Sequence, residues 1–398
     1  MFDTELFQAE GFCRPDYDGG SIVNLLSSII RSRGGSSPHP ELTAVDGSLF
    51  RRASKIVYLV LDGVGYNQLQ RFISAGRGQE FFAKQPCVKI TSVFPPTTAA
   101  AVTSFSTGTT PAEHAVVSWY LQLPDLGMVS AVLPGTTRTG TPMALPEFDL
   151  RRYLALPSYL ASVSGHKRLL SYGRLGQSRY SNAGTEWDQH AAYTTLRGLE
   201  GQVRSFSAES TRGIAYVYWP KYDTLCHARG CEHRDTKSHL DEIDRSLARL
   251  AHGLSGTGTL LCVTADHGLV DTPIGRRIDL SKIPGFLDCL AVLPSGDARE
   301  VSCFVRASQA ARFGDIVAEH LSEACVSITG DELLESGLLG PGRCHRALAS
   351  RIGDTVLIAR QDYAFLCSVP FVSAKTHKGN HGGLSADEIY VPLYAQLS

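Results

Sequence analysis

Three uninterrupted apolar runs constrain the fold of this 398-residue chain more than any other feature of its sequence. They read KIVYLVL at 55–61, IAYVYW at 214–219 and TLLCVT at 259–264, and all three are rich in β-branched residues. Such a run is typical of a strand within a parallel sheet, because helices cover both faces of that kind of sheet. The runs therefore predict an α/β fold with a central, mostly parallel sheet flanked by helices.

Acidic and histidine side chains follow each of these runs. Asp62 comes directly after the first run, and Asp223 and His227 follow the second, one helical turn apart. Asp266 and His267 follow the third run as neighbours. Open α/β sheets bind their ligands beyond the carboxyl ends of the strands. Each residue alone could be a cap or a surface pair, but the same outcome after three strands predicts a shared site.

The segment 92–108, SVFPPTTAAAVTSFSTG, places a threonine hydroxyl at the start of a predicted helix. Its two prolines favour extended or turn backbone, the residues from Thr98 onward suit a helix, and Gly108 suits the helix end. A strand, a tight turn, a hydroxyl residue and a helix form a common mounting for a nucleophile in α/β enzymes. Thr97 or Thr98 is therefore either a simple N-cap or a nucleophile.

A glycine-rich loop, KTHKGNHGGL at 375–384, adds His377 and His381. Its glycines allow backbone and imidazole to approach a ligand closely. Three carboxylates and three imidazoles suffice for two divalent metal ions, which can clamp both oxygens of a phosphoryl displacement. Mixed nitrogen and oxygen ligands favour zinc over magnesium. The collected set comprises Asp62, Asp223, His227, Asp266, His267 and His381, with Thr98 as the hydroxyl.

The composition argues against several classes of partner. Charged residues make up 19% of the chain and the formal net charge is -1, so neither a nucleic acid nor an anionic membrane is expected. The first residues, MFDTELFQAEGF, are acidic where a signal peptide is basic and then apolar. The ten cysteines form no CxxC pair. We therefore expect reduced, mostly buried thiols in a cytoplasmic protein, whose oligomeric state the sequence leaves open.

The segment 280–366 differs in character from the rest of the chain. Short strand-like runs, a helix and a glycine-rich loop predict a small α/β subdomain there. We interpret it as an insertion, because the histidine-bearing loop follows it. The predicted organisation is a catalytic core over residues 1–279, the insertion, and a return to the core over residues 367–398. The insertion is expected to shape the pocket rather than to supply ligands.

The motifs VLDG, FPPTT…STG, DxxxH, TADHG and HGG occur in this order between residues 55 and 384. Their order and spacing resemble the type I phosphodiesterase/nucleotide pyrophosphatase family of the alkaline phosphatase superfamily. The resemblance implies an alkaline-phosphatase-like fold and a two-zinc hydrolase of phosphodiester or pyrophosphate bonds. It selects Thr98 as the nucleophile that forms a covalent phosphothreonine-type intermediate. It also implies one zinc on Asp223, His227 and His381, and another on Asp62, Asp266, His267 and the Thr98 oxygen.

The chain departs from that family at two places. Alanines 99–101 follow the nucleophile where the family has a phenylalanine–proline–asparagine run. Trp119 stands where the family has a second asparagine, which contacts a phosphoryl oxygen. The backbone N–H of Ala99 and the side chains of Lys221 and Asn380 are the candidates to replace these contacts, and the sequence does not choose among them.

Other activities of the superfamily make different demands on these residues. A sulfatase needs a C/S-x-P-x-R pattern, which the sequence lacks, and a phosphoglycerate-mutase-like enzyme uses serine where this chain has Thr98. A phosphomonoesterase or a phosphonate (C–P) hydrolase is an alternative on the same scaffold, and a non-catalytic, zinc-bearing scaffold protein is another. The expected substrate is a small-molecule phosphoester or a nucleotide.

Overall fold

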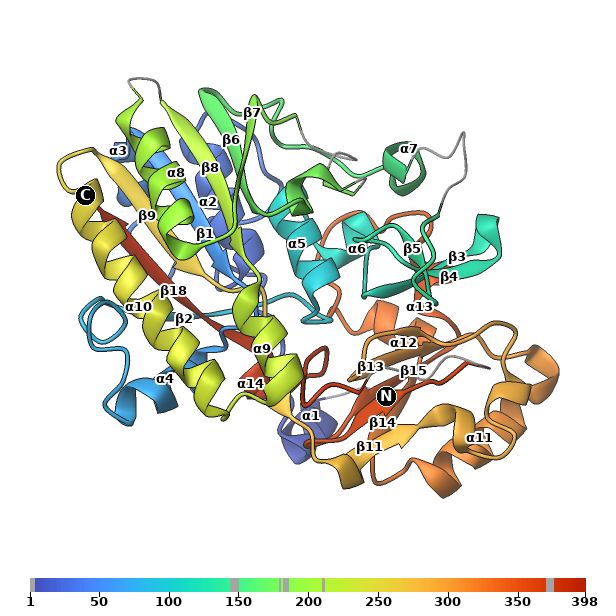
Figure 1. Cartoon of the computed structure of the whole chain (residues 1–398). Helices are drawn as coiled ribbons and strands as arrows, with labels where there is room; N and C mark the ends of the chain where they lie inside the picture. Colours follow the sequence, from blue (N-terminus) through green and yellow to red (C-terminus); the bar gives the residue numbers. More distant parts are fainter. Residues whose placement is uncertain (1–3, 144–149, 179, 182–185, 210–211, 370–375) are drawn as a thin grey trace.

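Two seven-stranded sheets organise the chain (Figure 1). The computed structural model describes residues 4–143, 150–178, 180–181, 186–209, 212–369 and 376–398. The first sheet has the strand order β2-β18-β9-β1-β8-β6-β7. Its strands are β1 (Lys55–Leu61), β2 (Val88–Thr91), β6 (His166–Tyr172), β7 (Gln189–Tyr193), β8 (Gly213–Trp219), β9 (Thr259–Thr264) and β18 (Tyr390–Leu397).

The first sheet is mostly parallel. Its central strand β1 pairs in parallel with β8 on one side and with β9 on the other, and β6 and β7 continue the parallel arrangement. Only β18 among its strands runs against its neighbours, β9 and β2. Every residue of β1 and β9 is buried, as expected for strands that are covered on both faces. The fold class predicted from the apolar runs is confirmed.

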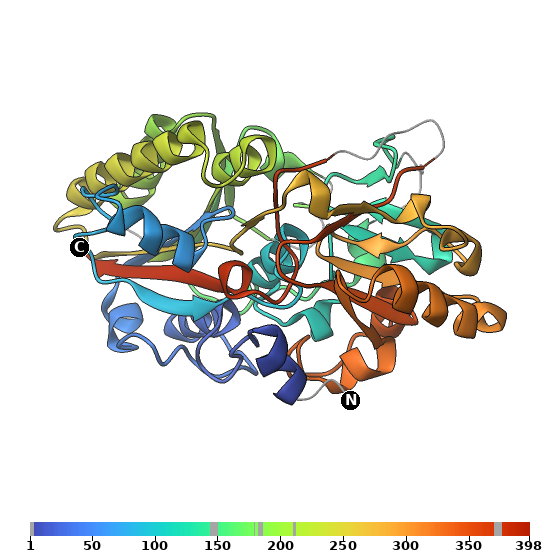
Figure 2. The same cartoon turned by 90° about the horizontal axis from the view of Figure 1, so that it is seen from below.

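Helices cover both faces of this sheet (Figure 2). The helices α4 (Tyr66–Ser74), α8 (Leu196–Ala208) and α10 (Arg234–Leu254) lie on one face, and α2 (Ile22–Ser32) and α5 (Thr98–Thr107) lie on the other. Their apolar sides form one hydrophobic core with the strands. The helices α3 (Ser48–Arg52), α9 (Lys221–Arg229) and α14 (Ala386–Ile389) also lie around this sheet, whereas α1 (Thr4–Glu10) contributes Phe7 to a second hydrophobic cluster.

The second sheet is antiparallel throughout, with the order β14-β15-β13-β12-β3-β4-β5. Its strands are β3 (Tyr120–Leu123), β4 (Met128–Ala131), β5 (Thr136–Thr137), β12 (Ser295–Gly296), β13 (Glu300–Cys303), β14 (Cys325–Thr329) and β15 (Thr355–Ala359). Residues 120–137 were predicted to belong to the catalytic core of residues 1–279. In the structure their strands join those of the 280–366 segment, through pairing of Tyr120 with Gly296.

Shorter elements complete the structure. The helices α11 (Ala310–His320), α12 (Gly330–Glu335) and α13 (Leu348–Ile352) accompany the second sheet, and α6 (Pro111–His114) and α7 (Leu150–Leu154) lie in the connections. Two small strand pairs are β10 (Val270–Asp271) with β17 (Gly379–Asn380), and β11 (Arg277–Asp279) with β16 (Ala364–Leu366). Within the described ranges, none of the helices combines the length and apolar character of a membrane span. All ten cysteines are free thiols and seven are buried, as predicted.

A buried ion pair connects the two sheets. Arg299, just before β13, donates from Nε and Nη2 to the carboxylate of Glu388 in α14, at 2.7 and 3.0 Å. Both side chains are completely buried. A buried pair of this kind is tolerated only where further hydrogen bonds satisfy its remaining donors and acceptors. The carbonyl of Tyr363 accepts from Arg299, and the backbone N–H of Gly383 donates to Glu388 at 2.8 Å.

Candidate metal centre and active site

The carboxyl ends of three parallel strands meet at one edge of the first sheet. The register aligns Leu61 at the end of β1 with Trp219 at the end of β8, and Val60 with Thr264 at the end of β9. The acidic residues that follow these strands are thereby delivered to the same place. The structure thus brings together the residues that the sequence analysis selected after the three apolar runs.

Two adjacent threonines take different places at the start of α5. Thr97 is the N-cap, and its Oγ1 accepts a hydrogen bond from the backbone N–H of Ala100 at 3.3 Å. Thr98 is the first helical residue, and its Oγ1 lies 3.1 Å from Nε2 of His267. Gly108 ends the helix in the left-handed conformation, with a φ of 70°. The capping role therefore falls to Thr97, which leaves the Thr98 hydroxyl facing the strand ends.

The first cluster of possible metal ligands comprises Asp223, His227 and His381. Asp223 and His227 lie one turn apart on α9, with His227 Nε2 3.2 Å from Asp223 Oδ2. His381 Nε2 lies 4.0 Å from the other oxygen, Oδ1. Because His227 Nδ1 donates to the carbonyl of Gly379 at 2.7 Å, its Nε2 is the nitrogen available to a metal. This trio is the set that the resemblance implied for one ion.

The second cluster comprises Asp62, Asp223 and His267, whose ligand atoms lie within 4.8 Å of one another. His267 Nδ1 donates to the carbonyl of Gly268 at 3.1 Å, and its Nε2 lies 3.6 Å from Asp62 Oδ1. Asp223 therefore belongs to both clusters and stands between the two candidate ion positions.

Asp266 lies at the border of the second cluster. Its Oδ1 accepts from the backbone N–H groups of Gly63 and His267, both at 3.1 Å. Its Oδ2 accepts from the hydroxyl of Tyr218 at 3.1 Å and lies 3.8 Å from His267 Nε2. Asp266 is thus near the predicted position, but both of its oxygens already accept hydrogen bonds.

The electrostatics of the clusters fit a bound cation. Asp62 Oδ1, Asp223 Oδ1 and His381 Nδ1 are buried and have no hydrogen-bond partner among the described residues. Burial, and then the charges of Asp266 and Asp223, raise the pKa of Asp62 well above its usual range. Burial alone lowers the pKa of His227, but the Asp223 carboxylate raises it to about 9. Carboxylate and imidazole groups crowded without partners fit divalent metal ions.

The three predicted substrate contacts lie in different places. Ala99 is completely buried in α5 and offers only its backbone. Asn380 lines the cavity beside the clusters, but its amide donates to Thr272 Oγ1 at 2.6 Å and to the carbonyl of His377 at 3.2 Å. Lys221 lies over the ring of Trp219, with Nζ 5.6 Å from the ring centroid, and lines a separate pocket. The structure therefore does not bring Lys221 to the clusters.

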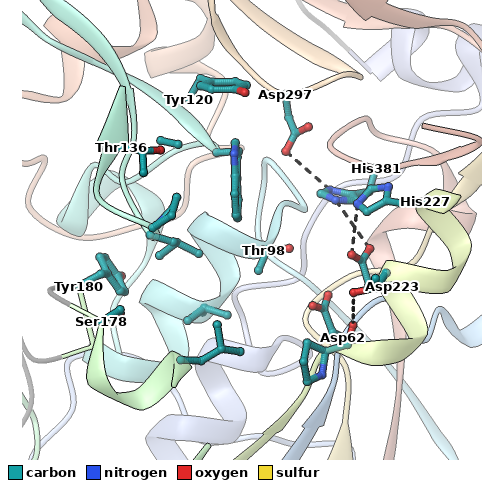
Figure 3. A pocket seen from close by; sticks show the side chains of 18 of the residues that line it. Asp62, Thr98, Tyr120, Thr136, Ser178, Tyr180, Asp223, His227, Asp297 and His381 are labelled. Carbon is teal, nitrogen blue, oxygen red and sulfur yellow. Dashed lines mark hydrogen bonds and ion pairs between the residues drawn. The ribbon is translucent and has the colours of Figure 1, made fainter. Parts of the chain in front are cut away.

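Asp297 is a candidate site residue that was not predicted from the sequence. It lies between β12 and β13, and its Oδ2 is 4.0 Å from His381 Nδ1 (Figure 3). The same view shows Thr98 facing the converging side chains of Asp223, His227 and His381. No motif surrounds Asp297 in the sequence, because only the pairing of distant strands in the second sheet brings it here.

A family model describes this arrangement. The model for the type I phosphodiesterase/nucleotide pyrophosphatase family matches residues 56–143 and 146–384, most of the chain. The chain belongs to this family. Membership of this family supports a phosphoester hydrolase. The matched residues include every residue of the two clusters. No curated protein sequence is significantly similar to it.

Several solved structures have a fold similar to that of this family member. Murine ectonucleotide pyrophosphatase/phosphodiesterase 5 has a TM-score of 0.62 at 16% identity, over 86% of this chain and 88% of that chain. An inactive threonine-to-alanine variant of the murine protein, in complex with AMP, has a TM-score of 0.63 at 15% identity, over 86% and 87%. Phosphonoacetate hydrolase from Sinorhizobium meliloti, in complex with phosphonoformate, has a TM-score of 0.60 at 18% identity, over 85% and 89%.

This family member has a large cavity beside the two clusters. Its volume is about 1020 Å³, and residues from both sheets line it. Its lining includes eight aromatic side chains, Trp119 and Tyr120 among them. Among the described lining residues, Arg138 and Arg174 are the only Lys or Arg side chains. Arg138 donates to the carbonyl of Pro294 at 2.7 Å and lies over the ring of Tyr120. The cavity therefore suits a bulky, apolar group more than a highly charged one.

Proposed function

We propose that this chain is a two-metal hydrolase of phosphodiester or pyrophosphate bonds, with Thr98 as its nucleophile. The observation that carries the proposal is the place of the Thr98 hydroxyl, 3.1 Å from His267 Nε2 and beside both ligand clusters. Zinc is the proposed metal, because the donors are carboxylates and imidazoles. The proposed ligands are Asp62, Asp223, His227, Asp266, His267, His381 and the Thr98 oxygen.

The bound ions would lower the pKa of the attacking hydroxyl and balance the charge of the phosphoryl group. Thr98 Oγ1 attacks phosphorus, and the bond to the leaving alcohol breaks as that alcohol takes up a proton. Water then cleaves the bond between phosphorus and Thr98, which restores the hydroxyl and releases a phosphate monoester. The backbone N–H of Ala99 lies in the first turn of α5, where unpaired amides and the helix dipole favour a phosphoryl oxygen.

The relatives support a small-molecule substrate. The murine variant is described as a complex with AMP, and the Sinorhizobium enzyme as a complex with phosphonoformate. A nucleotide or another small phosphoester is therefore the proposed partner of this chain, and its cytoplasmic location stays a prediction. Hydrolysis of a C–P bond is the second candidate, because a phosphonate hydrolase has a similar fold.

We predict that kcat/KM is at least about tenfold higher for bis(p-nitrophenyl) phosphate than for p-nitrophenyl phosphate. A monoester dianion brings one more negative charge than a diester, and selectivity for it needs a further cation near the nucleophile. Lys221 lies in a separate pocket, Arg138 is engaged by Pro294 and Tyr120, and Arg174 is an exposed residue of the cavity wall. Both substrates are to be measured on one zinc-loaded preparation.

The same assay separates the alternatives. A clear preference for the monoester contradicts the proposal and identifies a phosphomonoesterase. Release of phosphate from phosphonoacetate without diester hydrolysis identifies a C–P hydrolase. A metal-loaded protein that turns over none of these substrates, nor a nucleotide pyrophosphate bond, is a binding or scaffold protein.

A further inference from the structure

The turn between β12 and β13 reaches from the second sheet to the loop that carries His381. Asp297 begins this turn, and its backbone N–H donates to the carbonyl of Glu300 at 2.6 Å. Its Oδ1 accepts from the backbone N–H of Ala298 at 2.7 Å. The first bond holds the backbone of the turn and the second holds the carboxylate, whose Oδ2 lies 4.0 Å from Nδ1 of His381 (Figure 3).

His381 needs an acceptor at that nitrogen. Its Nε2 faces Asp223 Oδ1 at 4.0 Å within the first cluster, so Nε2 is the nitrogen directed to the metal position. A neutral imidazole that offers Nε2 to a metal carries its proton on Nδ1. The residue is only 4% exposed, and Nδ1 has no hydrogen-bond partner among the described residues. The carbonyl of Pro96 also faces the ring and is the competing acceptor.

The same turn also fixes the backbone of the loop. Arg299, two residues after Asp297, forms the buried ion pair with Glu388. Glu388 in turn accepts from the backbone N–H of Gly383 at 2.8 Å, two residues after His381. A side chain at Gly383 would meet the Glu388 carboxylate at 2.9 Å, so the loop and the ion pair are in close contact. Two separate contacts from one turn therefore converge on the His381 loop.

We propose that Asp297 is a positioning residue, which accepts the Nδ1 proton of His381 and so orients this ring for metal binding from the second sheet. Metal-ligating histidines commonly donate their other N–H to a carboxylate, which fixes the tautomer and strengthens the ligand. The separation of 4.0 Å is one that a small side-chain rotation or a bridging water closes. The inference rests on the proposed metal function of the first cluster. It gives the second sheet a part in building the metal centre.

The test is zinc affinity, measured on the full chain by competition with a chromogenic chelator. Asp297→Ala is expected to lower the affinity for one of the two zinc ions by about 10- to 100-fold and to leave the affinity for the other unchanged. Asp297→Asn keeps the shape of the side chain and one acceptor oxygen. Its zinc affinity should therefore lie between the affinities of Asp297→Ala and the wild type. Asp288→Asn changes an exposed carboxylate outside the cavity and serves as the matched control.

The visible spectrum of the cobalt-substituted protein provides a second readout, because its bands report the geometry around the ion. Asp297→Ala should alter the bands of one site, whereas Asp288→Asn should leave them unchanged. Wild-type zinc affinity in Asp297→Ala would overturn the inference and leave the Pro96 carbonyl as the acceptor. A wild-type chain that binds no zinc would instead overturn the proposed function. If Asp297→Ala does not fold, wild-type affinity in the isosteric Asp297→Asn together with unchanged cobalt bands overturns the inference equally.

Discussion

Replacement of Thr98 by alanine is expected to lower turnover of bis(p-nitrophenyl) phosphate by at least about three orders of magnitude. Alanine removes Thr98 Oγ1, the oxygen that would attack phosphorus. This oxygen lies 3.1 Å from His267 Nε2, beside both clusters. The carboxylates and imidazoles of the clusters stay in place, so the metal content should remain close to that of the wild type. Steady-state kinetics and elemental analysis of one preparation measure both quantities.

Thr97→Ala is the matched control for that variant. Thr97 caps α5 through its Oγ1, so its loss should cost about 1 kcal/mol of stability and affect turnover far less. Mass spectrometry of protein quenched during turnover should locate a phosphoryl adduct on Thr98 in the wild type and none in Thr98→Ala. Near wild-type rates in Thr98→Ala would contradict the covalent route and favour direct attack by water.

Asp223→Asn is expected to reduce bound zinc from about two ions per chain to one or fewer, and turnover by about two orders of magnitude or more. The resemblance to the family implied that Asp223 binds one ion, but its carboxylate belongs to both clusters in the structure. Asparagine keeps the shape of the side chain and removes the charge. The measurement is zinc stoichiometry after equilibration in buffer of fixed free zinc, followed by the diester assay.

Two further variants make this result specific. Asp62→Asn affects only the second cluster and should retain about one zinc ion. Asp235→Asn removes a carboxylate near the start of α10 whose side chain is 47% exposed, and it should retain both ions. Full occupancy with unchanged affinity in Asp223→Asn would show that the two positions do not share this ligand.

The strands of the first sheet were predictable because burial leaves a simple pattern. β1 and β9 have the bounds of the apolar runs at 55–61 and 259–264, since a strand covered on both faces tolerates few polar residues. The antiparallel unit of β3, β4 and β5 gives no comparable pattern in the sequence. Its strands are short and only partly buried, and β3 finds its neighbour β12 in a distant part of the sequence. Pairing between such distant segments is not visible in local patterns.

The same distinction separates the site residues. The convergence of Asp62 and Asp266 was predictable because parallel strands end at a common edge, and each residue follows such a strand closely. Asp297 was not, because the second sheet brings it to His381 from a segment without a motif. The position of Lys221, away from the two clusters, has a geometric reason. Lys221 lies two residues before Asp223 on a helix, and side chains two residues apart point to different sides of a helix.

The central claim, a hydrolase that works with two metal ions, is tested most directly by a zinc titration of the chelator-stripped protein. Hydrolysis of bis(p-nitrophenyl) phosphate is followed while zinc is added and the bound metal is measured in the same samples. We expect no turnover without metal and a rise that levels off at about two equivalents of bound zinc per chain. Undiminished diester turnover by the metal-free protein, or full turnover with no zinc bound, would contradict the claim.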